Sequence, residues 1–309
     1  MDKFVDLHVH TVASDGSFTA AQLVKLARGA GLAAIAVTDH DTVAADRAAM
    51  AAGAADGLEV IAGVELSCDF TPTNIHMLGL FIDPADRALN DALVEVREYR
   101  ARRNPKILER LEKLGMPLAA EEVAAFAQGE TLSRVHIAHA MVARGYVKDT
   151  QEAFDRFLGK NKLAYVSRRR ISADEGIALV HGAGGLAFVA HPGLLALPPR
   201  ILEGMVFKLA RAGMDGLEVY YTDHLPADTA FLKRLADEYD LLMTGGTDFH
   251  GRAKPGVALG VGRGDLRVPY DLVARMKPRL ALARAKAAEA TEAANEAKAA
   301  VEAEKEDGE

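Results

Sequence analysis

The sequence has one cysteine, no tryptophan and no long apolar run. The first and the last of these shortages each exclude a class of structure. With Cys68 alone, the chain cannot form an internal disulfide. Charged residues, Gly or Pro interrupt every hydrophobic segment before it reaches the roughly 20 residues that a membrane-spanning helix needs. The N-terminus also lacks a basic segment followed by an apolar run and a small-residue cleavage site, so we expect a cytoplasmic protein with no membrane partner.

Basic residues are also in deficit, because 37 lysines and arginines face 44 acidic residues, for a net charge of −7 and a pI near 5.8. This balance argues against broad coating of nucleic acid, and we expect no DNA-binding domain, although an acidic protein can still hold a local basic cleft. Half of the 309 residues are hydrophobic, which is enough to fill one large barrel or two smaller domains. The oligomeric state is not predicted.

Short β-rich runs alternate with helical stretches along most of the chain. This rhythm is typical of βαβ units and predicts an α/β fold with a mostly parallel sheet. The expected strands lie at residues 4–9, 33–38, 58–64, 75–82, 185–190, 216–220 and 241–244. Between the fourth and the fifth of them the rhythm stops, and a long, charge-rich helical stretch intervenes.

We therefore predict a discontinuous barrel domain made of residues 1–83 and 171–279, with a helical subdomain inserted at 84–170. The last segment, 280–309, is a mixture of Ala, Glu and Lys with almost no large apolar residues. Such a segment has little to bury, so we expect a solvated helix or a disordered tail. A coiled coil is the alternative, but the apolar positions of a heptad are missing.

Histidines gather where the expected strands end. His8 and His10 leave the same face of the first strand and can converge on one ion, although such pairs also occur in ordinary packing. Six of the ten histidines lie at or beside such ends, where a parallel α/β barrel builds its active site. Besides His8 and His10, the residues at these ends are His40, Glu65, His76, His191, Asp248 and His250. Mixed imidazole and carboxylate ligands suit Zn, Mn or Fe rather than Ca or Mg alone, and they predict a multinuclear metal site.

The motifs at these ends resemble those of the polymerase and histidinol phosphatase (PHP) family. They are Asp6-Leu7-His8-Val9-His10-Thr11, Ser14-Asp15-Gly16-Ser17, Thr38-Asp39-His40-Asp41, Gly63-Val64-Glu65, His76, His191-Pro192 and Asp248-Phe249-His250. The resemblance covers nearly the whole chain apart from the tail. Within the family, the sequence most resembles the bacterial branch that includes nucleoside 3′,5′-bisphosphate phosphatase and a 5′-to-3′ exoribonuclease acting on short RNA. The resemblance implies a distorted (β/α)7 TIM-like barrel that holds three metals.

The same resemblance implies three sets of metal ligands. The sets are His8, His10, Glu65 and Asp248; Glu65, His76 and His191; and Asp15, His40 and His250. No ligand position is substituted, so we expect two or three divalent ions of Mn, Fe or Zn. Asp39 is a candidate catalytic residue that orients His40 through a hydrogen bond, and its alternative is to cap the next helix. Asp6 and Glu218 are expected to support the ligands from their strand ends.

Hydrolysis of a phosphate monoester requires that the charge of the ester be neutralised and that hydroxide be supplied near neutral pH. Clustered divalent ions do both, because they hold the phosphoryl oxygens and lower the pKa of a bound water. The leaving alkoxide still needs a proton. His224 is the candidate general acid, and its alternative is an ordinary surface histidine.

Substrate contacts are expected from the inserted helices. The segment Ser133-Arg134-Val135-His136 looks like a helix N-terminus, which favours an anion, so Arg134 and His136 are predicted phosphate contacts. A second basic cluster, at the return to the barrel, contains Lys160, Lys162, Arg168, Arg169 and Arg170. Arg97, Arg100 and Arg103 either line the same cleft or pair with nearby glutamates. Aromatic stacking partners are few, with Tyr220 and Tyr221 best placed, which favours short substrates over long RNA.

The sequence thus predicts a phosphatase or phosphodiesterase whose substrate is a nucleotide or a short 5′-phosphorylated RNA. A histidinol-phosphate phosphatase is the nearest enzyme alternative, since the same metal site would serve it. An amidohydrolase would also use a metal barrel but gives no reason for the basic insertion. A structural or regulatory metal module is the non-enzyme alternative.

Overall fold

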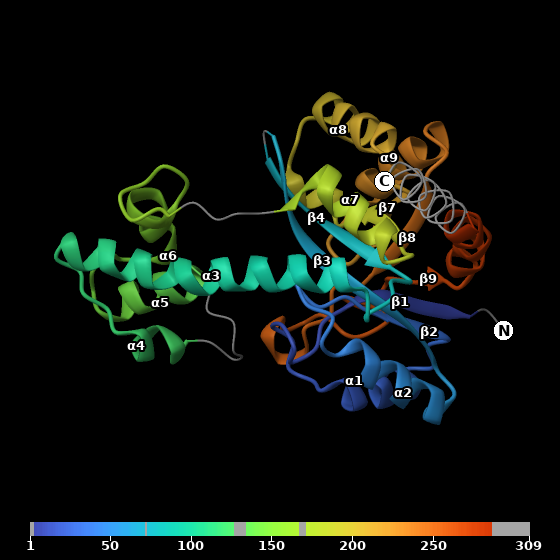
Figure 1. Cartoon of the computed structure of the whole chain (residues 1–309), viewed down its shortest axis with the longest axis horizontal. Coiled ribbons are helices and arrows are strands. Elements are labelled where there is room, and N and C mark those ends of the chain that lie inside the picture. The colour runs from blue at the N-terminus through green and yellow to red at the C-terminus, as the bar shows by residue number, and fades with distance from the viewer. Residues whose placement is uncertain (1–2, 72, 127–133, 167–170, 286–309) are drawn as a thin grey trace, which may run out of the picture.

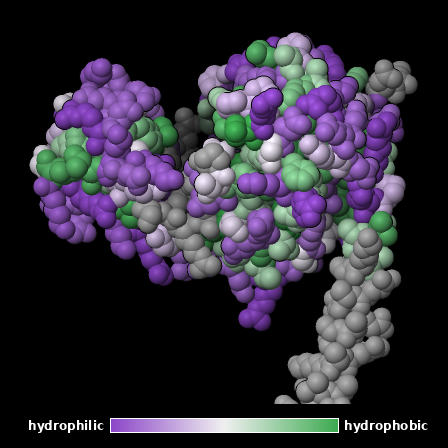
Figure 2. Space-filling model, turned by 90° about the horizontal axis from the view of Figure 1, so that it is seen from above, coloured by the Kyte–Doolittle hydropathy of each residue, from purple (hydrophilic) through white to green (hydrophobic). Residues whose placement is uncertain are grey.

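The computed structural model describes residues 3–71, 73–126, 134–166 and 171–285. A barrel with surrounding helices forms the larger part, and a helical insertion stands to one side of it (Figure 1). The face seen in Figure 2 is mostly hydrophilic, with apolar side chains in small scattered groups. Among the helices of the described ranges, none is both long enough and apolar enough to cross a membrane.

The strands expected from the sequence are all present and form a nearly closed barrel, as predicted. They are β1 (Phe4–Val9), β2 (Ala34–Val37), β3 (Glu59–Phe70), β4 (Thr73–Leu80), β6 (Leu186–Val189), β7 (Gly216–Tyr221) and β8 (Leu242–Gly246). Their order in the sheet is β8-β7-β6-β4-β3-β2-β1, followed by the short β9 (Val268–Pro269), while β5 (Ile171–Ser172) pairs with β3. A parallel bridge between Val9 and Phe249 joins the end of β1 to the segment after β8.

Of the seven strands expected from the sequence, one runs against the others. β4 pairs antiparallel with both β3 and β6, whereas β1 to β3 and β6 to β8 are parallel within each group. Because of this reversal, the first half of β4 lies beside the second half of β3, and His76 pairs with Ser67. His76 therefore reaches the rim formed by the carboxyl ends of the parallel strands, although it belongs to the first half of its own strand.

Five helices surround the barrel: α1 (Ala20–Gly29), α2 (Asp46–Asp56), α7 (Ala173–Gly182), α8 (Pro199–Arg211) and α9 (Pro226–Glu238). Two of their starts are encoded locally: Thr19 forms a capping box with Gln22 at α1, and Ser172 forms one with Glu175 at α7. Short 3-10 helices follow β6 and β8, at η2 (Pro192–Leu195) and η3 (Gly251–Ala253).

A last helix, at residues 271–285, closes one end of the barrel. Its Met276 and Leu280 are buried in the cluster that also holds Leu7 and Phe188. Arg284 donates hydrogen bonds to the carbonyls of Phe81 and Gly184, so the helix stays attached to the barrel at that point. The remainder of the predicted tail, 286–309, lies outside the described residues.

The insertion contains α3 (Arg87–Lys113), α4 (Ala120–Ala124), α5 (Arg134–Ala143), α6 (Thr150–Ala153) and the π-helix η1 (Phe154–Leu158). The long helix α3 connects it to the barrel (Figure 1). Leu89 and Leu93 of α3 pack into the barrel's outer core, whereas Ile107 and Leu111 belong to a separate core within the insertion. The first half of α3 is thus shared with the barrel, and the domain limits at 84 and 170 stay predictions.

Asp46 makes the stability of the fold depend on pH. Its Oδ1 accepts a hydrogen bond from the Gly63 amide at 2.8 Å, while Oδ2 is buried without a partner. Burial, with a smaller effect of the Asp39 charge, raises the Asp46 pKa well above its ordinary value. The neutral form therefore stabilises the fold at low pH, and this contribution is lost as the pH rises through the folded-state pKa.

We expect Asp46→Asn to raise the free energy of unfolding relative to the unsubstituted protein at pH 8, by about 1 kcal/mol, with the gain shrinking toward pH 5. Urea unfolding at the two pH values measures this difference. Asp56→Asn, at the exposed end of the same helix, is the control and should have no pH-dependent effect. An equal change for Asp46→Asn at both pH values would contradict the prediction.

Candidate metal centre

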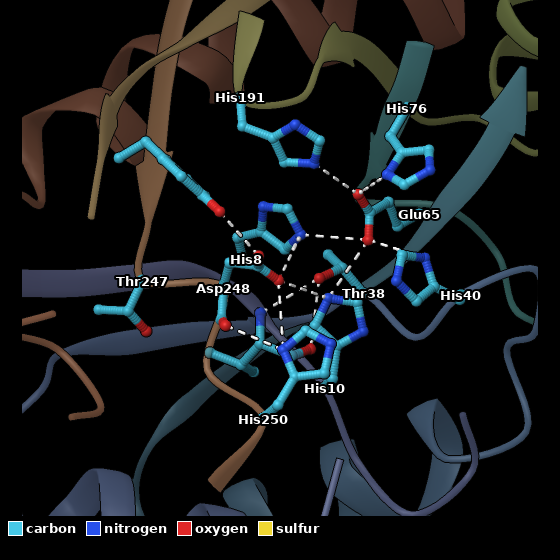
Figure 3. A network of polar contacts seen from close by, with 12 residues as sticks. His8, His10, Thr38, His40, Glu65, His76, His191, Thr247, Asp248 and His250 are labelled. Atoms are coloured by element: carbon cyan, nitrogen blue, oxygen red, sulfur yellow. Dashed lines mark hydrogen bonds and ion pairs between the residues drawn. The ribbon is translucent and has the colours of Figure 1, made fainter. Parts of the chain in front are cut away.

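The nine ligands predicted from the sequence meet at one rim of the barrel. They come from β1 and the loop after it (His8, His10, Asp15), from the loop after β2 (His40), from β3 and β4 (Glu65, His76), and from the loops after β6 and β8 (His191, Asp248, His250). Figure 3 labels all of these except Asp15, and the labelled side chains turn their polar ends toward one another. The structure thus gathers residues that are as far as 242 positions apart, from His8 to His250, into one cluster.

Glu65 is at the centre of the cluster and is 1% exposed. Its Oε2 lies 3.3 Å from His8 Nε2, 3.3 Å from His10 Nε2 and 2.9 Å from His40 Nδ1. Its Oε1 lies 2.8 Å from His76 Nδ1 and 3.0 Å from His191 Nε2. Each carboxylate oxygen faces a different set of imidazoles, as expected of a carboxylate that bridges two ions.

Three sets of ligand atoms are compact enough to hold an ion, with all atoms of a set within 4.8 Å of one another. The sets are His8, His10, Glu65 and Asp248; His10, Asp15, His40 and His250; and His40, Glu65 and His76. The first set is the one implied by the family resemblance for the first ion. In the second set His10 is added to the implied ligands, and in the third His40 takes the place of His191.

The cluster contains buried polar atoms that have no hydrogen-bond partner. They are Nε2 of His8, both ring nitrogens of His10, Oε2 of Glu65 and Nδ1 of His76. Buried polar atoms are normally hydrogen-bonded, and leaving one unpaired costs roughly 1–3 kcal/mol. Imidazole nitrogens and carboxylate oxygens are donors for divalent transition metals, so the residues present fit a metal site.

The carboxylates of the cluster are held in the charged form that metal binding requires. Burial raises the pKa of Glu65, but the nearby imidazoles of His40, His76 and His8 lower it, and the net shift is well below the ordinary value. Asp248 behaves in the same way: burial raises its pKa, while His8 and His10 bring it well below its usual range.

Two further carboxylates support the cluster. Glu218 in β7 is fully buried, lies 3.0 Å from His8 Nδ1 and accepts a hydrogen bond from the His191 amide at 2.6 Å. With Nδ1 of His8 directed to Glu218, its Nε2 is left for an ion. Asp6 accepts hydrogen bonds from the amide and hydroxyl of Thr247 and from the Gly260 amide, and burial raises its pKa to about 6. These contacts agree with the supporting roles expected for both residues.

The hydrogen bonds of Asp39 go to the loop after β1. Asp39 is fully buried, and its Oδ1 accepts hydrogen bonds from the Thr11 amide and the Ser14 hydroxyl, at 2.8 and 2.6 Å. Its Oδ2 accepts a third from the Thr11 hydroxyl at 2.6 Å. Both oxygens therefore hold the loop that carries Asp15. Asp39 does not cap α2, because that helix has Ala45 at its N-cap.

His224 has both ring nitrogens in hydrogen bonds. Nδ1 lies 3.0 Å from the Val219 carbonyl, which can only accept, so Nδ1 carries the proton. Nε2 then accepts a hydrogen bond from the Gly193 amide at 3.1 Å. The ring lies against Gly193, where a Cβ would come within 2.7 Å of it, and it fixes the turn after His191. In this arrangement the predicted general acid holds no proton on Nε2, and donation would require the Gly193 bond to break.

Two of the predicted phosphate contacts, Arg134 and Lys160, line a cavity of about 380 Å³ between the β3–β4 hairpin and the insertion. Arg134 begins α5 and lines this cavity with Lys160, and its guanidinium also donates to the Leu158 carbonyl at 2.6 Å. Burial and then the charge of His139 lower the pKa of His136, and the charge of Asp15 opposes this shift. Lys162 is exposed, and Arg169 lies outside the described residues.

Two of the three helical arginines donate hydrogen bonds to backbone carbonyls. Arg97 donates to the Asp41 carbonyl at 2.8 Å, next to His40, and Arg103 donates to the Val166 carbonyl at 3.1 Å. The glutamate pairing holds for a neighbouring residue, Arg102, which bonds to Glu98 one turn away. Of Arg100, the structure describes only the helical backbone.

Sequence reasoning missed the contacts on the outer side of Asp248. Tyr221, expected only as a stacking surface, donates its hydroxyl proton to Asp248 Oδ2 at 2.9 Å, and Lys254 lies 2.8 Å from the same oxygen. Tyr220 points elsewhere and packs against the apolar cores. The only signal in the sequence was a lysine six residues after a predicted ligand, which by itself indicates no contact.

Comparison with known proteins places this site in a family. The chain matches the model of the PHP domain over residues 6–168. It is 33% identical to the 3′,5′-nucleoside bisphosphate phosphatase of Chromobacterium violaceum, over 83% of this chain and 90% of that protein. It is 34% identical to a 5′-3′ exoribonuclease of Haemophilus influenzae, over 81% of this chain and 91% of that protein.

A solved structure agrees with these matches. A protein of Bifidobacterium adolescentis, described as a candidate metal-dependent phosphoesterase, superposes with a TM-score of 0.73 at 34% identity, over 88% of this chain and 95% of that one. The family model spans more than half of the 309 residues, and both relatives exceed 30% identity over four fifths of them. The chain therefore belongs to the PHP domain family.

Proposed function

We propose that this protein hydrolyses phosphate esters of nucleotides, such as 3′,5′-bisphosphates and nucleoside monophosphates, or of short 5′-phosphorylated RNA. The observation that carries the proposal is the cluster of buried, unpaired imidazole and carboxylate atoms beside a cavity lined by Arg134 and Lys160. His8, His10, Asp15, His40, Glu65, His76, His191, Asp248 and His250 would hold two or three ions of Mn, Fe or Zn. Such ions neutralise phosphoryl oxygens and activate water.

The position of the cavity suits a substrate larger than a single phosphate. His76 and Asn74 are two residues apart in β4, on the same face of the strand and about 7 Å from each other. His76 belongs to the cluster, and Asn74 lines the cavity. A substrate with one phosphate at the cluster can therefore extend into the cavity, where Arg134 and Lys160 would bind a second phosphate. His136 and Lys162, from the same insertion, and Arg169 are proposed to extend this anion site.

The relatives support this substrate class, since one acts on nucleoside bisphosphates and another on RNA from its 5′ end. A histidinol-phosphate phosphatase remains the second candidate, because the metal cluster would serve it equally. That activity gives less reason for two basic side chains, Arg134 and Lys160, in a separate cavity. A regulatory metal module would not need the complete ligand set that the rim presents.

The substrate class is tested first by phosphate release from adenosine 3′,5′-bisphosphate, 5′-phosphorylated RNA trimers and histidinol phosphate, each with Mn²⁺ and with chelator. We expect turnover of the first two with Mn²⁺ only. His8→Ala should lower it at least about 100-fold, because one ligand of the Glu65 cluster is lost. Turnover of histidinol phosphate alone would overturn the nucleotide assignment, and turnover in chelator would overturn the metal mechanism.

The cavity is tested by Arg134→Met. We expect the KM for the bisphosphate to rise roughly 10- to 100-fold, the usual value of a charge-assisted hydrogen bond, with little change for p-nitrophenyl phosphate. Arg156→Met is a matched control, because this arginine also lies over a phenylalanine ring but pairs with Glu152 on the exposed side of the insertion. Since Arg134 also bonds to Leu158, thermal unfolding must accompany the kinetics. An equal loss for both substrates would argue against a second-phosphate site.

The role of His224 is tested by the leaving group. If the ring holds the turn after His191, His224→Gln should slow adenosine 3′,5′-bisphosphate and p-nitrophenyl phosphate by the same factor. A general acid would matter for the ribose alkoxide and not for p-nitrophenolate, which leaves without a proton. The hydrogen bonds of both ring nitrogens favour the equal loss. A loss confined to the ribose ester would restore His224 as the acid.

A further inference from the structure

The two oxygens of Asp248 face different surroundings. Oδ1 lies 3.1 Å from His10 Nε2 and 3.5 Å from His8 Nε2, on the side of the ligand cluster. Oδ2 lies 2.9 Å from the Tyr221 hydroxyl and 2.8 Å from Lys254 Nζ, on the opposite side. The carboxylate is therefore divided into an oxygen that faces the proposed ion and an oxygen that faces two proton donors.

The direction of these hydrogen bonds follows from the chemistry of the groups. The Lys254 ammonium can only donate, and it lies 3.0 Å from the Tyr221 hydroxyl. The ionised Asp248 carboxylate can only accept, so the hydroxyl proton of Tyr221 points to Oδ2. Lys254 also lies 5.2 Å from the centre of the Tyr221 ring. The three groups form a closed triangle, which leaves the hydroxyl a single orientation.

Asp248 needs such contacts because its own chain does not fix the carboxylate. The terminal torsion of an aspartate has a broad, roughly two-fold preference, so either oxygen, or both, can turn toward the cluster. Tyr221 is itself held firmly, because it is 4% exposed and its ring centre lies 5.4 Å from that of His191.

We propose that Tyr221 is a positioning residue that holds Asp248 as a one-oxygen ligand and thereby sets the affinity of the ion shared with His8, His10 and Glu65. Lys254 fixes the hydroxyl in the required direction. The inference rests on the metal centre proposed above. Groups that orient a metal ligand in this way typically change metal affinity 10- to 100-fold when they are removed.

The same triangle occurs a second time in the barrel, away from the ligands, and supplies a matched control. Tyr270 donates to Glu59 Oε2 at 2.6 Å, and Lys277 lies 3.0 Å from the Tyr270 hydroxyl and 5.5 Å from its ring centre. Glu59 begins β3, six residues before Glu65, so this triangle lies toward the other end of the strands. Tyr270→Phe removes the same hydroxyl as Tyr221→Phe without touching the cluster.

The test is calorimetric titration of Mn²⁺ into the full chain after chelator treatment. Tyr221→Phe leaves the charge unchanged, so it isolates positioning from electrostatics. We expect it to weaken one equivalent of Mn²⁺ about 10-fold and to leave the others as in the unsubstituted protein. Excess Mn²⁺ should restore turnover of the bisphosphate. Tyr270→Phe should leave every equivalent unchanged.

A double-mutant cycle shows whether Tyr221 acts through Asp248. In an Asp248→Ala background, Tyr221→Phe should have no further effect on Mn²⁺ binding, because the oriented group is gone. An additive effect there, or unchanged affinities in the single variant, would overturn the positioning role while leaving the metal centre intact. Failure of the unsubstituted protein to bind Mn²⁺ would instead overturn the metal centre itself, and this inference with it.

Discussion

The burial of Glu65 among five imidazoles is the constraint on which the rest of the site depends. A carboxylate that is 1% exposed and faces His8, His10, His40, His76 and His191 is stable only if its charge and the neighbouring lone pairs find partners. The protein donors are too few, since several of these atoms have no hydrogen bond. Divalent ions would supply positive charge there, which would link metal binding to the stability of the rim.

Buried carboxylates also hold the loops that carry the ligands. Asp6 joins β1 to Thr247, Asp39 joins the loop at Thr11 to the end of β2, and Glu218 joins His8 to the His191 amide. Each uses both oxygens for these bonds, so they are structural partners of the site. Glu65 and Asp248 differ, because each directs an oxygen toward His8 Nε2, the nitrogen that the Glu218 contact leaves for an ion. The rim therefore contains two kinds of carboxylate, distinguished by what their oxygens accept.

The barrel and the insertion have separate roles in the proposed function. The ligands come from barrel strands and their loops, whereas Arg134 and Lys160 reach the cavity from the insertion. The two parts are joined by α3, whose Leu89 packs on the barrel and whose Ile107 packs within the insertion. Arg97 of the same helix bonds to the Asp41 carbonyl, beside His40. Changes in the insertion can therefore alter which ester is bound while the metal cluster stays the same.

The sequence by itself determined the strands, the α/β barrel and the gathering of eight candidate ligands at strand ends, because strand periodicity and motif spacing are local. Tertiary structure decided how those residues meet. The reversal of β4 brings His76 to the rim, and barrel closure brings Tyr221 to Asp248 and His224 to Gly193, across 27 and 31 residues. Asp39 shows the same limit, since its partners lie 25 and 28 residues earlier. Hydrogen-bond partners that are set by how distant strands come together leave no mark in local spacing, so the partners of the supporting residues emerged only from the folded chain.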